Sequence, residues 1–280
     1  GNSRIRSVNL EPIQGSRPNI SGRYEAPKLP AWTQHVNLFL EHRAATDLRN
    51  CRQELLSVTE KIETLQAHLQ GADWQKHLLT ETDDTLEVAV LRAFREVGVA
   101  IERGPKNLAD LLAIVDDTIL CIEVKGFMGG TKDFVINQCE KWVTDVRAAL
   151  TVPEGELDEG TRKYLPILAR LGILPVGTEE ELTWKIRPLL ISNTYRDTPL
   201  KQRSAESFSG SQETKLKKQG VVAITSVQVL GIYAQFRDDL DDAMESIRSL
   251  LVGGGVSDVC ADWTKYLFES DVQSEVAAGQ

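Results

Sequence analysis

The feature that most constrains the fold is a pair of short apolar runs separated by two aspartates. Residues 108–115 and 118–124 are rich in Leu, Ile and Val, and only Asp116 and Asp117 lie between them. Apolar runs of this length are typical of buried strands, and a two-residue polar break between two of them predicts a β-hairpin. If the two aspartates form the turn, residue 115 pairs with 118 and each further pair steps outward by one residue.

This register brings charged side chains together at the open end of the hairpin. Extended outward, it places Asp110 directly opposite Glu123, and Cβ atoms of such a pair lie ~4.5–5.5 Å apart. Side chains alternate between the two faces of a strand, so Lys125 shares the face of Glu123 while residues 120, 122 and 124 point the other way. The sequence therefore predicts two carboxylates and an ammonium group on one face.

Such a cluster suits a particular chemistry. Two adjacent carboxylates are costly unless a cation lies between them or one of them is protonated, and hard oxygen ligands favour Mg²⁺ or Mn²⁺. Phosphodiester hydrolysis needs a metal-activated water and neutralisation of charge on the phosphate, to which a lysine can contribute. The alternative is a solvated salt-bridge cluster, in which Asp110 and Glu123 pair with Lys125 and Arg103.

At this point the chain resembles a known family. Asp110, followed after twelve residues by Glu123-Val124-Lys125 at the end of an apolar strand, resembles the PD-(D/E)xK signature of restriction-endonuclease-like nucleases. Ala109 stands where the family nominally has proline. The helix predicted over 132–150 carries Gln138 and Trp142, which is similar to the Gln-xxx-Tyr element of the RecB-like branch, with Trp in place of Tyr.

The resemblance implies an α/β fold with a restriction-endonuclease-like mixed β-sheet flanked by helices. It implies Asp110 and Glu123 as metal ligands, the main-chain carbonyl of Val124 as a third ligand and Lys125 as the catalytic lysine. Glu87, on a helix predicted over 85–97, would be auxiliary; its alternative is a solvent-facing residue.

Two residues of the 132–150 helix have alternatives of their own. Gln138 would assist catalysis, or it is a polar residue on the helix face. Trp142 is interpreted as a packing residue, with base stacking as the alternative.

The activity that the resemblance implies is Mg²⁺-dependent (Mn²⁺ as substitute) endonucleolytic hydrolysis of DNA, with RNA as an open alternative. Such a core with a helical arm resembles bacterial defence or DNA-processing effectors. A different hypothesis is a catalytically inactive module that uses the same fold to bind nucleic acid or to assemble. A third is a scaffold that acts mainly through its helical arm.

We expect one nuclease-like domain over residues 72–252 and a tail over 253–280 that begins with a glycine linker. Residues 151–184 give no clear pattern, and residues 157–177 within them are interpreted as a family-specific insertion that covers the site. The remaining elements predicted for the domain are strands over 186–192 and 221–225 and helices over 226–236 and 240–251.

The N-terminal part is predicted to be a flexible arm over residues 1–31, which offers a site for a partner protein, and a helical segment over 32–71. The helical segment carries apolar residues in alternating steps of three and four, which is the signature of a coiled coil. We therefore predict a homodimer, whose two sites for two strands favour an endonuclease; the alternative is an amphipathic helix lying on its own domain. The seam consists of Leu48, Cys51, Leu55, Val58, Ile62, Leu65 and Leu69.

A basic region lies between residues 185 and 218, which contains eight Lys and Arg residues and only three acidic ones. Basic residues of a loop at a strand end can contact a phosphate backbone without reading sequence, and residues 204–219 are interpreted as a polar, mobile loop. The alternative is a solvated loop. The predicted nucleic-acid contacts are Arg196, Lys201, Arg203, Lys215, Lys217 and Lys218.

Composition narrows the class of protein. The net charge of −9 argues against non-specific coating of nucleic acid. The four cysteines are scattered without a CxxC pair, so a structural zinc site is not expected, and apolar free thiols suit a reducing compartment, which predicts a cytoplasmic protein. No apolar run approaches the roughly 20 residues of a membrane span, so we expect no membrane partner.

Overall fold

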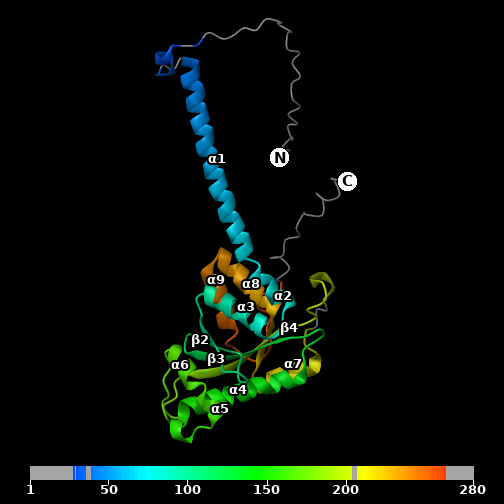
Figure 1. Cartoon of the computed structure of the whole chain (residues 1–280). Coiled ribbons are helices and arrows are strands. Elements are labelled where there is room, and N and C mark those ends of the chain that lie inside the picture. The colour runs from blue at the N-terminus through cyan, green and yellow to red at the C-terminus, as the bar shows by residue number, and fades with distance from the viewer. Residues whose placement is uncertain (1–27, 29, 36–38, 204–206, 263–280) are drawn as a thin grey trace. The chain divides into compact units, whose positions relative to one another are not determined.

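The computed structural model describes residues 28, 30–35, 39–203 and 207–262 (Figure 1). Most of the predicted arm over 1–31 and most of the predicted tail over 253–280 therefore lie outside the described residues. The chain divides into two compact units, residues 1–65 and 66–280, and the second unit contains the whole β-sheet. The predicted domain boundaries stay predictions.

A mixed sheet of six strands forms the centre of the second unit. Its order follows the chain from β1 to β6; β2 is antiparallel to both of its neighbours, β1 and β3, and β3 to β6 run parallel. The predicted mixed sheet flanked by helices is confirmed, although the sequence did not indicate the short edge strands β1 and β6. The strands are β1 (Ala100–Arg103), β2 (Leu111–Val115), β3 (Thr118–Gly126), β4 (Lys185–Asn193), β5 (Val222–Thr225) and β6 (Gly255–Val256).

The hairpin of β2 and β3 has the predicted turn and register. Val115 pairs with Thr118, and the ladder continues outward to Leu111 and Ile122. Asp116 adopts a φ of 52°, a left-handed conformation that aspartate tolerates better than most residues do. Because β3 lies between β2 and β4 and is covered on both faces, it is a nearly continuous apolar run.

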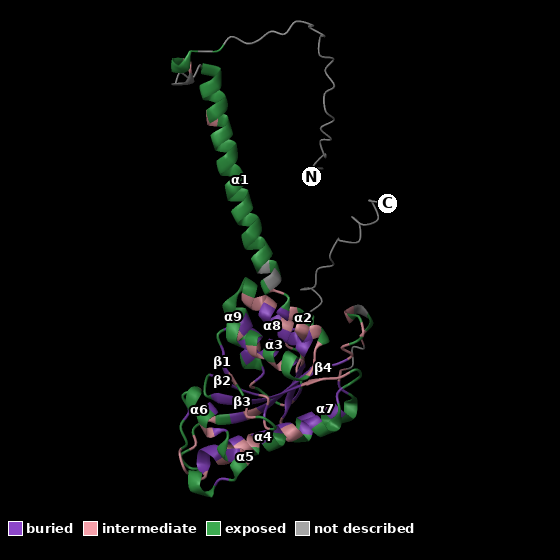
Figure 2. Cartoon of the chain, in the orientation of Figure 1, coloured by how far each residue is buried: buried purple, intermediate pink, exposed green. Residues whose placement is uncertain are grey.

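One face of the sheet is covered by helices α2 (Trp74–Thr80), α3 (Asp83–Glu96), α8 (Ser226–Asp238) and α9 (Leu240–Ser249). The even-numbered side chains of β3 pack in this layer, as predicted. Each helix has an apolar face that cannot be exposed without cost, and Figure 2 shows the buried residues concentrated on the strands and on the helix faces turned toward them.

The other face is covered by α4 (Asp133–Thr151), α5 (Glu159–Arg162), α6 (Leu165–Arg170) and α7 (Gly210–Gln219). Short 3-10 turns at Glu154–Glu156 and Leu200–Gln202 join these elements. Residues 151–184, for which the sequence gave no clear pattern, form part of this layer. Tyr164 and Leu168 from that segment are fully buried beside Trp142 of α4.

Two predictions about loops are wrong. Residues 204–219 were expected to be a polar, mobile loop, but Gly210–Gln219 forms α7. Its start is fixed by a capping box, in which Ser209 and Gln212 satisfy each other's backbone amides. A single buried leucine, Leu216, anchors its apolar side, which is too weak a periodicity to detect in the sequence.

The triple glycine at 253–255 was expected to be a linker, yet Gly255 begins β6 and pairs with Val222 of β5. A Cβ on Gly254 would approach the backbone of Gly220 to 2.9 Å, so the absence of a side chain is what lets this segment lie against the end of α7. Glycine here marks close backbone approach rather than flexibility.

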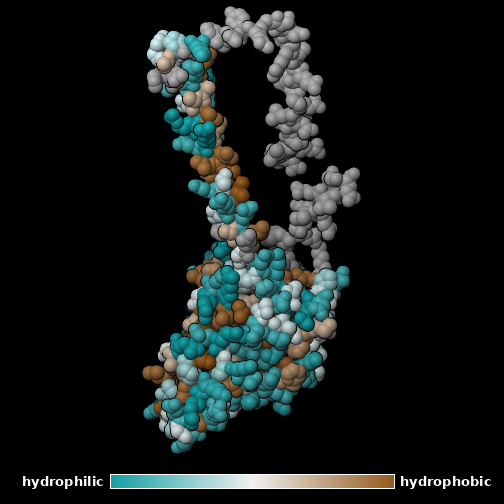
Figure 3. Space-filling view, viewed as in Figure 1, coloured by the Kyte–Doolittle hydropathy of each residue, from teal (hydrophilic) through white to brown (hydrophobic). Residues whose placement is uncertain are grey.

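The N-terminal region contains a 3-10 turn at Ala31–His35 and the long helix α1 (Phe39–Gly71). The predicted helix is therefore present. Its apolar seam is exposed, from 49% at Ile62 to 74% at Leu69, and Figure 3 shows hydrophobic residues along it. A single chain does not test the coiled coil. No helix among the described residues combines the length and the apolar character that crossing a membrane requires.

Candidate active site

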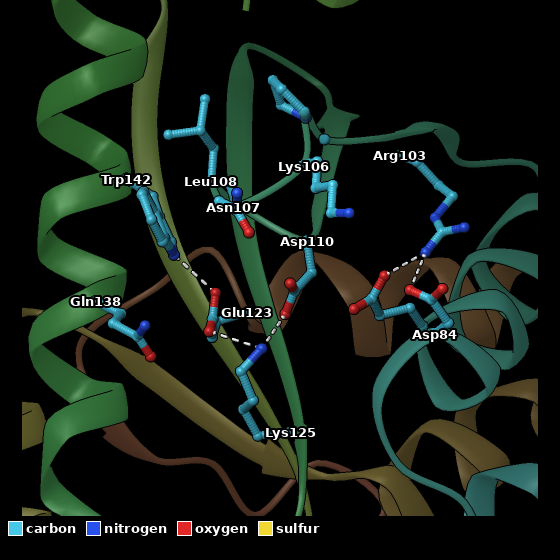
Figure 4. A pocket seen from close by; sticks show the side chains of 14 residues that line it. Asp84, Arg103, Lys106, Asn107, Leu108, Asp110, Glu123, Lys125, Gln138 and Trp142 are labelled. Atoms are coloured by element: carbon cyan, nitrogen blue, oxygen red, sulfur yellow. Dashed lines mark hydrogen bonds and ion pairs between the residues drawn. The ribbon is translucent and has the colours of Figure 1, made fainter. Parts of the chain in front are cut away.

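A pocket of about 730 Å³ opens where the hairpin ends, and it gathers side chains from both helical layers. Asp110 directly precedes β2, and Glu123 and Lys125 belong to β3. Gln138 and Trp142 reach the pocket from α4 (Figure 4). Glu87 of α3 also lines it. All the residues that the sequence singled out for the catalytic centre thus meet in one place.

The Lys125 ammonium group is the centre of the cluster. Its Nζ lies 2.8 Å from Asp110 Oδ2, 2.9 Å from Glu123 Oε1 and 3.2 Å from the main-chain oxygen of Val124. The backbone amide of Val124 also donates to Asp110 Oδ2, at 2.8 Å. Three oxygens, one from the residue before β2 and two from β3, therefore converge on one position and hold a cation there.

Burial sets the electrostatics of this cluster. The Glu123 side chain is only 2% exposed, and burial, followed by the nearby charge of Asp110, raises its pKa to about 7. For Lys125, burial lowers the pKa, but the attraction of Glu123 and Asp110 outweighs it, so the pKa is raised overall. The lysine thus remains a cation, and Glu123 is a carboxyl whose charge depends on its neighbours.

Trp142 holds the second oxygen of Glu123. The indole Nε1 donates to Glu123 Oε2 at 2.7 Å, and the tryptophan is 4% exposed. The sequence indicated packing for Trp142, and the packing is present, but the hydrogen bond gives the residue a second role. Because one oxygen faces Lys125 and the other faces the indole, the Glu123 carboxyl is fixed in orientation.

Glu87 is held in the pocket by an arginine. Arg103 of β1 donates to Glu87 Oε2 at 2.6 Å and to Asp84 at 2.9 Å. Burial raises the pKa of Glu87, against the effect of the Arg103 hydrogen bond, and the charge of Asp110 raises it further. Of the alternative salt-bridge cluster, the pairs of Lys125 with Asp110 and Glu123 are present. Arg103 is not part of that cluster in the described residues, because it pairs with Glu87 and Asp84.

Gln138 extends from α4 toward the Glu123 and Lys125 side of the pocket (Figure 4). Its Oε1 atom is buried and accepts no hydrogen bond within the described part of the chain. Buried carbonyl oxygens are nearly always hydrogen-bonded, so this atom offers an acceptor to whatever occupies the pocket.

The donor set fits a hard divalent cation. Asp110, Glu123 and the Val124 carbonyl supply oxygen only, as Mg²⁺ and Mn²⁺ prefer, and their convergence on the Lys125 ammonium shows that they can surround a positive charge. Within the described residues, no group of three His, Cys, Asp or Glu side chains is arranged for a metal. The Val124 carbonyl is therefore needed to complete the set.

The predicted nucleic-acid contacts do not line this pocket. Arg203 instead fastens its own loop, because its guanidinium donates to main-chain oxygens that include Leu79 at 2.6 Å and Thr198 at 2.9 Å, and burial lowers its pKa. Lys215 donates to the main-chain oxygen of Asp133 at 3.0 Å. The side chain of Lys201 is not among those that the structure describes. A role for these residues in binding stays a prediction.

Two contributions to the site were not predicted from the sequence. Tyr164, from the segment 151–184, accepts a hydrogen bond from the Ala109 amide at 3.1 Å and so supports the residue next to Asp110. The loop that carries Lys106 and Asn107 lines the pocket. The consecutive Gly104 and Pro105 signalled a turn there, but no local pattern showed that the turn faces Asp110.

Comparison with known proteins adds little. No protein-family model matches the chain, and no curated protein matches it. Among solved structures, the small subunit (R.BspD6I2) of the heterodimeric restriction endonuclease R.BspD6I is similar over 64% of this chain and 86% of that chain. The two share 12% sequence identity with a TM-score of 0.31, values that support no assignment by themselves.

Proposed function

We propose that this chain is a divalent-metal-dependent endonuclease that hydrolyses phosphodiester bonds of DNA. The observation that carries the proposal is the convergence of Asp110 Oδ2, Glu123 Oε1 and the Val124 carbonyl on one cation position. These oxygens come from residues that also match the PD-(D/E)xK pattern in spacing, so sequence and geometry support the same chemistry.

Each residue would have a definite task. Asp110, Glu123 and the Val124 carbonyl would hold Mg²⁺ or Mn²⁺, which supplies an acidified water and neutralises phosphate charge. Lys125, released from the three oxygens, would carry its ammonium to the attacked phosphate and stabilise charge there. Trp142 keeps the Glu123 carboxyl in place, and Gln138 offers an acceptor at the same wall.

The proposal is tested by the nicking of supercoiled plasmid by the full chain, with Mg²⁺ or Mn²⁺ and with EDTA. We expect nicking that needs the metal and is abolished in Lys125→Ala and Glu123→Gln. Lys185→Ala is the matched control, because Lys185 also forms a lysine–aspartate pair, with Asp117 at 2.8 Å, at the far end of the hairpin. If Lys125→Ala still nicks plasmid and the nicking still requires the metal, the assignment of Lys125 as a catalytic residue is refuted.

The second candidate function is an inactive module that binds nucleic acid through the same pocket. The ion pairs of Lys125 with both carboxylates favour it, since they place a cation between the two carboxylates without a metal. It predicts DNA binding without nicking under every metal condition. On the resemblance alone we place an active protein among DNA-processing or defence effectors.

We also propose that α1 pairs with α1 of a second copy. Its exposed leucines and isoleucine recur every seven residues at 48, 55, 62 and 69, with Cys51, Val58 and Leu65 between them, which is a seam that matches itself. Two active centres in one assembly would act on two strands. The side chains of Leu55 and Leu56 are equally exposed, at 66% and 64%, but only Leu55 belongs to the seam.

A further inference from the structure

The loop between β1 and β2, residues 104–109, is built to present its side chains to the pocket. Its base is closed by the Gly104 amide, which donates to the main-chain oxygen of Asp110 at 2.8 Å. A Cβ on Gly104 would collide with the carbonyl oxygen of Ala109, so the two ends of the loop touch only because this residue is glycine. The loop is therefore tied directly to the residue that the proposed function places at the metal.

The tip of the loop is as constrained as its base. Pro105 accepts a hydrogen bond from the Leu108 amide at 3.1 Å, and Asn107 adopts a φ of 68°. Asparagine is one of the few residues that populate this left-handed conformation readily. Lys106 and Asn107 consequently stand at the tip of a tight turn, and Figure 4 shows them reaching from that turn toward Asp110.

The charges that line the pocket leave one cation without a partner. The lining contains the four carboxylates of Asp84, Glu87, Asp110 and Glu123 and three cations. Arg103 pairs with Asp84 and Glu87, and Lys125 pairs with Asp110 and Glu123. Within the described ranges, Lys106 forms neither an ion pair nor a side-chain hydrogen bond.

The charge of the pocket indicates what Lys106 can bind. The lining carries a formal charge of −1, and one bound divalent ion would raise it to +1. A nucleic-acid strand brings further phosphates beside the one that reacts, and each needs a cation or a hydrogen-bond donor of its own. The three cations of the pocket are not equivalent, because only Lys106 can bind a phosphate without first leaving a carboxylate.

We infer that Lys106 is a phosphate-binding residue of the substrate site, which contacts a phosphodiester adjacent to the scissile one. The inference rests on the proposed function, because it takes the ligand to be a DNA strand lying across the Asp110, Glu123 and Lys125 cluster. The Asn107 amide stands beside it as a neutral donor to the same backbone. The loop thus sets the position of the strand while the cluster performs the chemistry.

The test is equilibrium binding of a fluorescein-labelled DNA duplex to the full chain, followed by anisotropy over a series of salt concentrations. Ca²⁺ replaces Mg²⁺ as an oxygen-seeking ion, and a gel verifies that the DNA stays intact. We expect Lys106→Ala to weaken binding about two- to fivefold, as for one exposed ion pair. The slope of log K against log salt should fall by about 0.9, as for one lost phosphate contact.

Two variants serve as controls. Lys106→Arg keeps the charge and should retain the wild-type salt slope. Lys163→Ala removes another exposed lysine, which lies outside the pocket lining and, unlike Lys106, has an ion-pair partner within the described part of the chain, Glu159. It should change neither affinity nor slope. Thermal unfolding of each variant shows whether the fold is kept.

The outcomes separate this inference from the proposed function. If Lys106→Ala matches Lys163→Ala in affinity and slope, or if the wild-type protein binds no duplex, the assignment of Lys106 is wrong. If plasmid is nicked but Lys106→Ala leaves the salt slope unchanged, the proposed nuclease activity is supported and the phosphate contact of Lys106 is refuted. If binding depends on Lys106 but no metal supports nicking, the phosphate contact stands and the nuclease fails.

Discussion

Replacement of Lys125 by methionine tests whether the ammonium group stabilises the two carboxylates of the central cluster. The methionine side chain matches the lysine stem in length and fills the same space, but it removes the ammonium from between Asp110 and Glu123. Two carboxylates, 13% and 2% exposed, then face each other without a cation. Removing one partner of a buried ion pair typically costs 3–5 kcal/mol, because the other charge is left uncompensated.

The structure places the expected loss near the lower end of that range. Lys125 itself is 25% exposed, so water already screens part of the attraction, and protonation of a buried carboxyl can relieve part of the repulsion. We expect about 3 kcal/mol in the absence of divalent ions. In a domain of this size that corresponds to a fall in melting temperature of roughly 6–12 °C.

The assay is thermal unfolding at neutral pH, in EDTA and in Mg²⁺. In the wild-type protein a divalent ion must displace the ammonium from the three oxygens, whereas Lys125→Met leaves that position open. Mg²⁺ should therefore raise the melting temperature of the variant more than that of the wild type, by the linkage between binding and stability. This readout does not depend on catalysis.

Lys185→Met is the matched control. Lys185 lies 2.8 Å from Asp117, but the two side chains are 64% and 59% exposed, and such surface pairs contribute about 0–1 kcal/mol. The reasoning is refuted if Lys125→Met is as stable as Lys185→Met in EDTA. It is also refuted if Mg²⁺ shifts the melting temperatures of Lys125→Met and the wild type equally.

Three further predictions follow from other contacts. Trp142→Phe removes the indole donor to Glu123 and should lower kcat of nicking at least about tenfold, more than KM changes; an unaltered kcat contradicts a positioning role. Tyr164→Phe deletes one buried hydrogen bond to the loop backbone and should cost about 1–2 kcal/mol in denaturant unfolding. Leu55→Asp should convert a dimer to monomer in analytical ultracentrifugation, whereas Leu56→Asp should not; a wild-type monomer disproves the pairing of α1.

The hairpin could be predicted in detail because its determinants are local. A two-residue turn fixes the register, and a strict alternation of side chains then fixes which residues share a face. The confirmed pairing of residues 111–115 with 118–122 is a consequence of these two rules alone. The meeting of Asp110, Glu123 and Lys125 could therefore be read from about sixteen consecutive residues.

Other parts of the site could not be predicted, because they depend on segments far apart in the sequence. The hydrogen bond from Trp142 to Glu123 needs α4 to lie across β3, and the support from Tyr164 needs a segment without a clear pattern to fold beneath Ala109. Likewise, whether Gly254 belongs to a linker or to an edge of the sheet depends on the approach of Gly220. No local propensity carries that information.

The sequence by itself determined the hairpin, the spacing of the three charged residues and the self-matching seam of α1, since each follows from a repeat of two or about three and a half residues along one stretch of chain. The tertiary structure decided which cations are already neutralised. In the sequence, Arg103, Arg203 and Lys106 are equally plausible as cations for a ligand. In the folded chain, both arginines are hydrogen-bonded to partners from distant segments. Because a charge is available to a ligand only where packing leaves it unpaired, that distinction belongs to the folded chain.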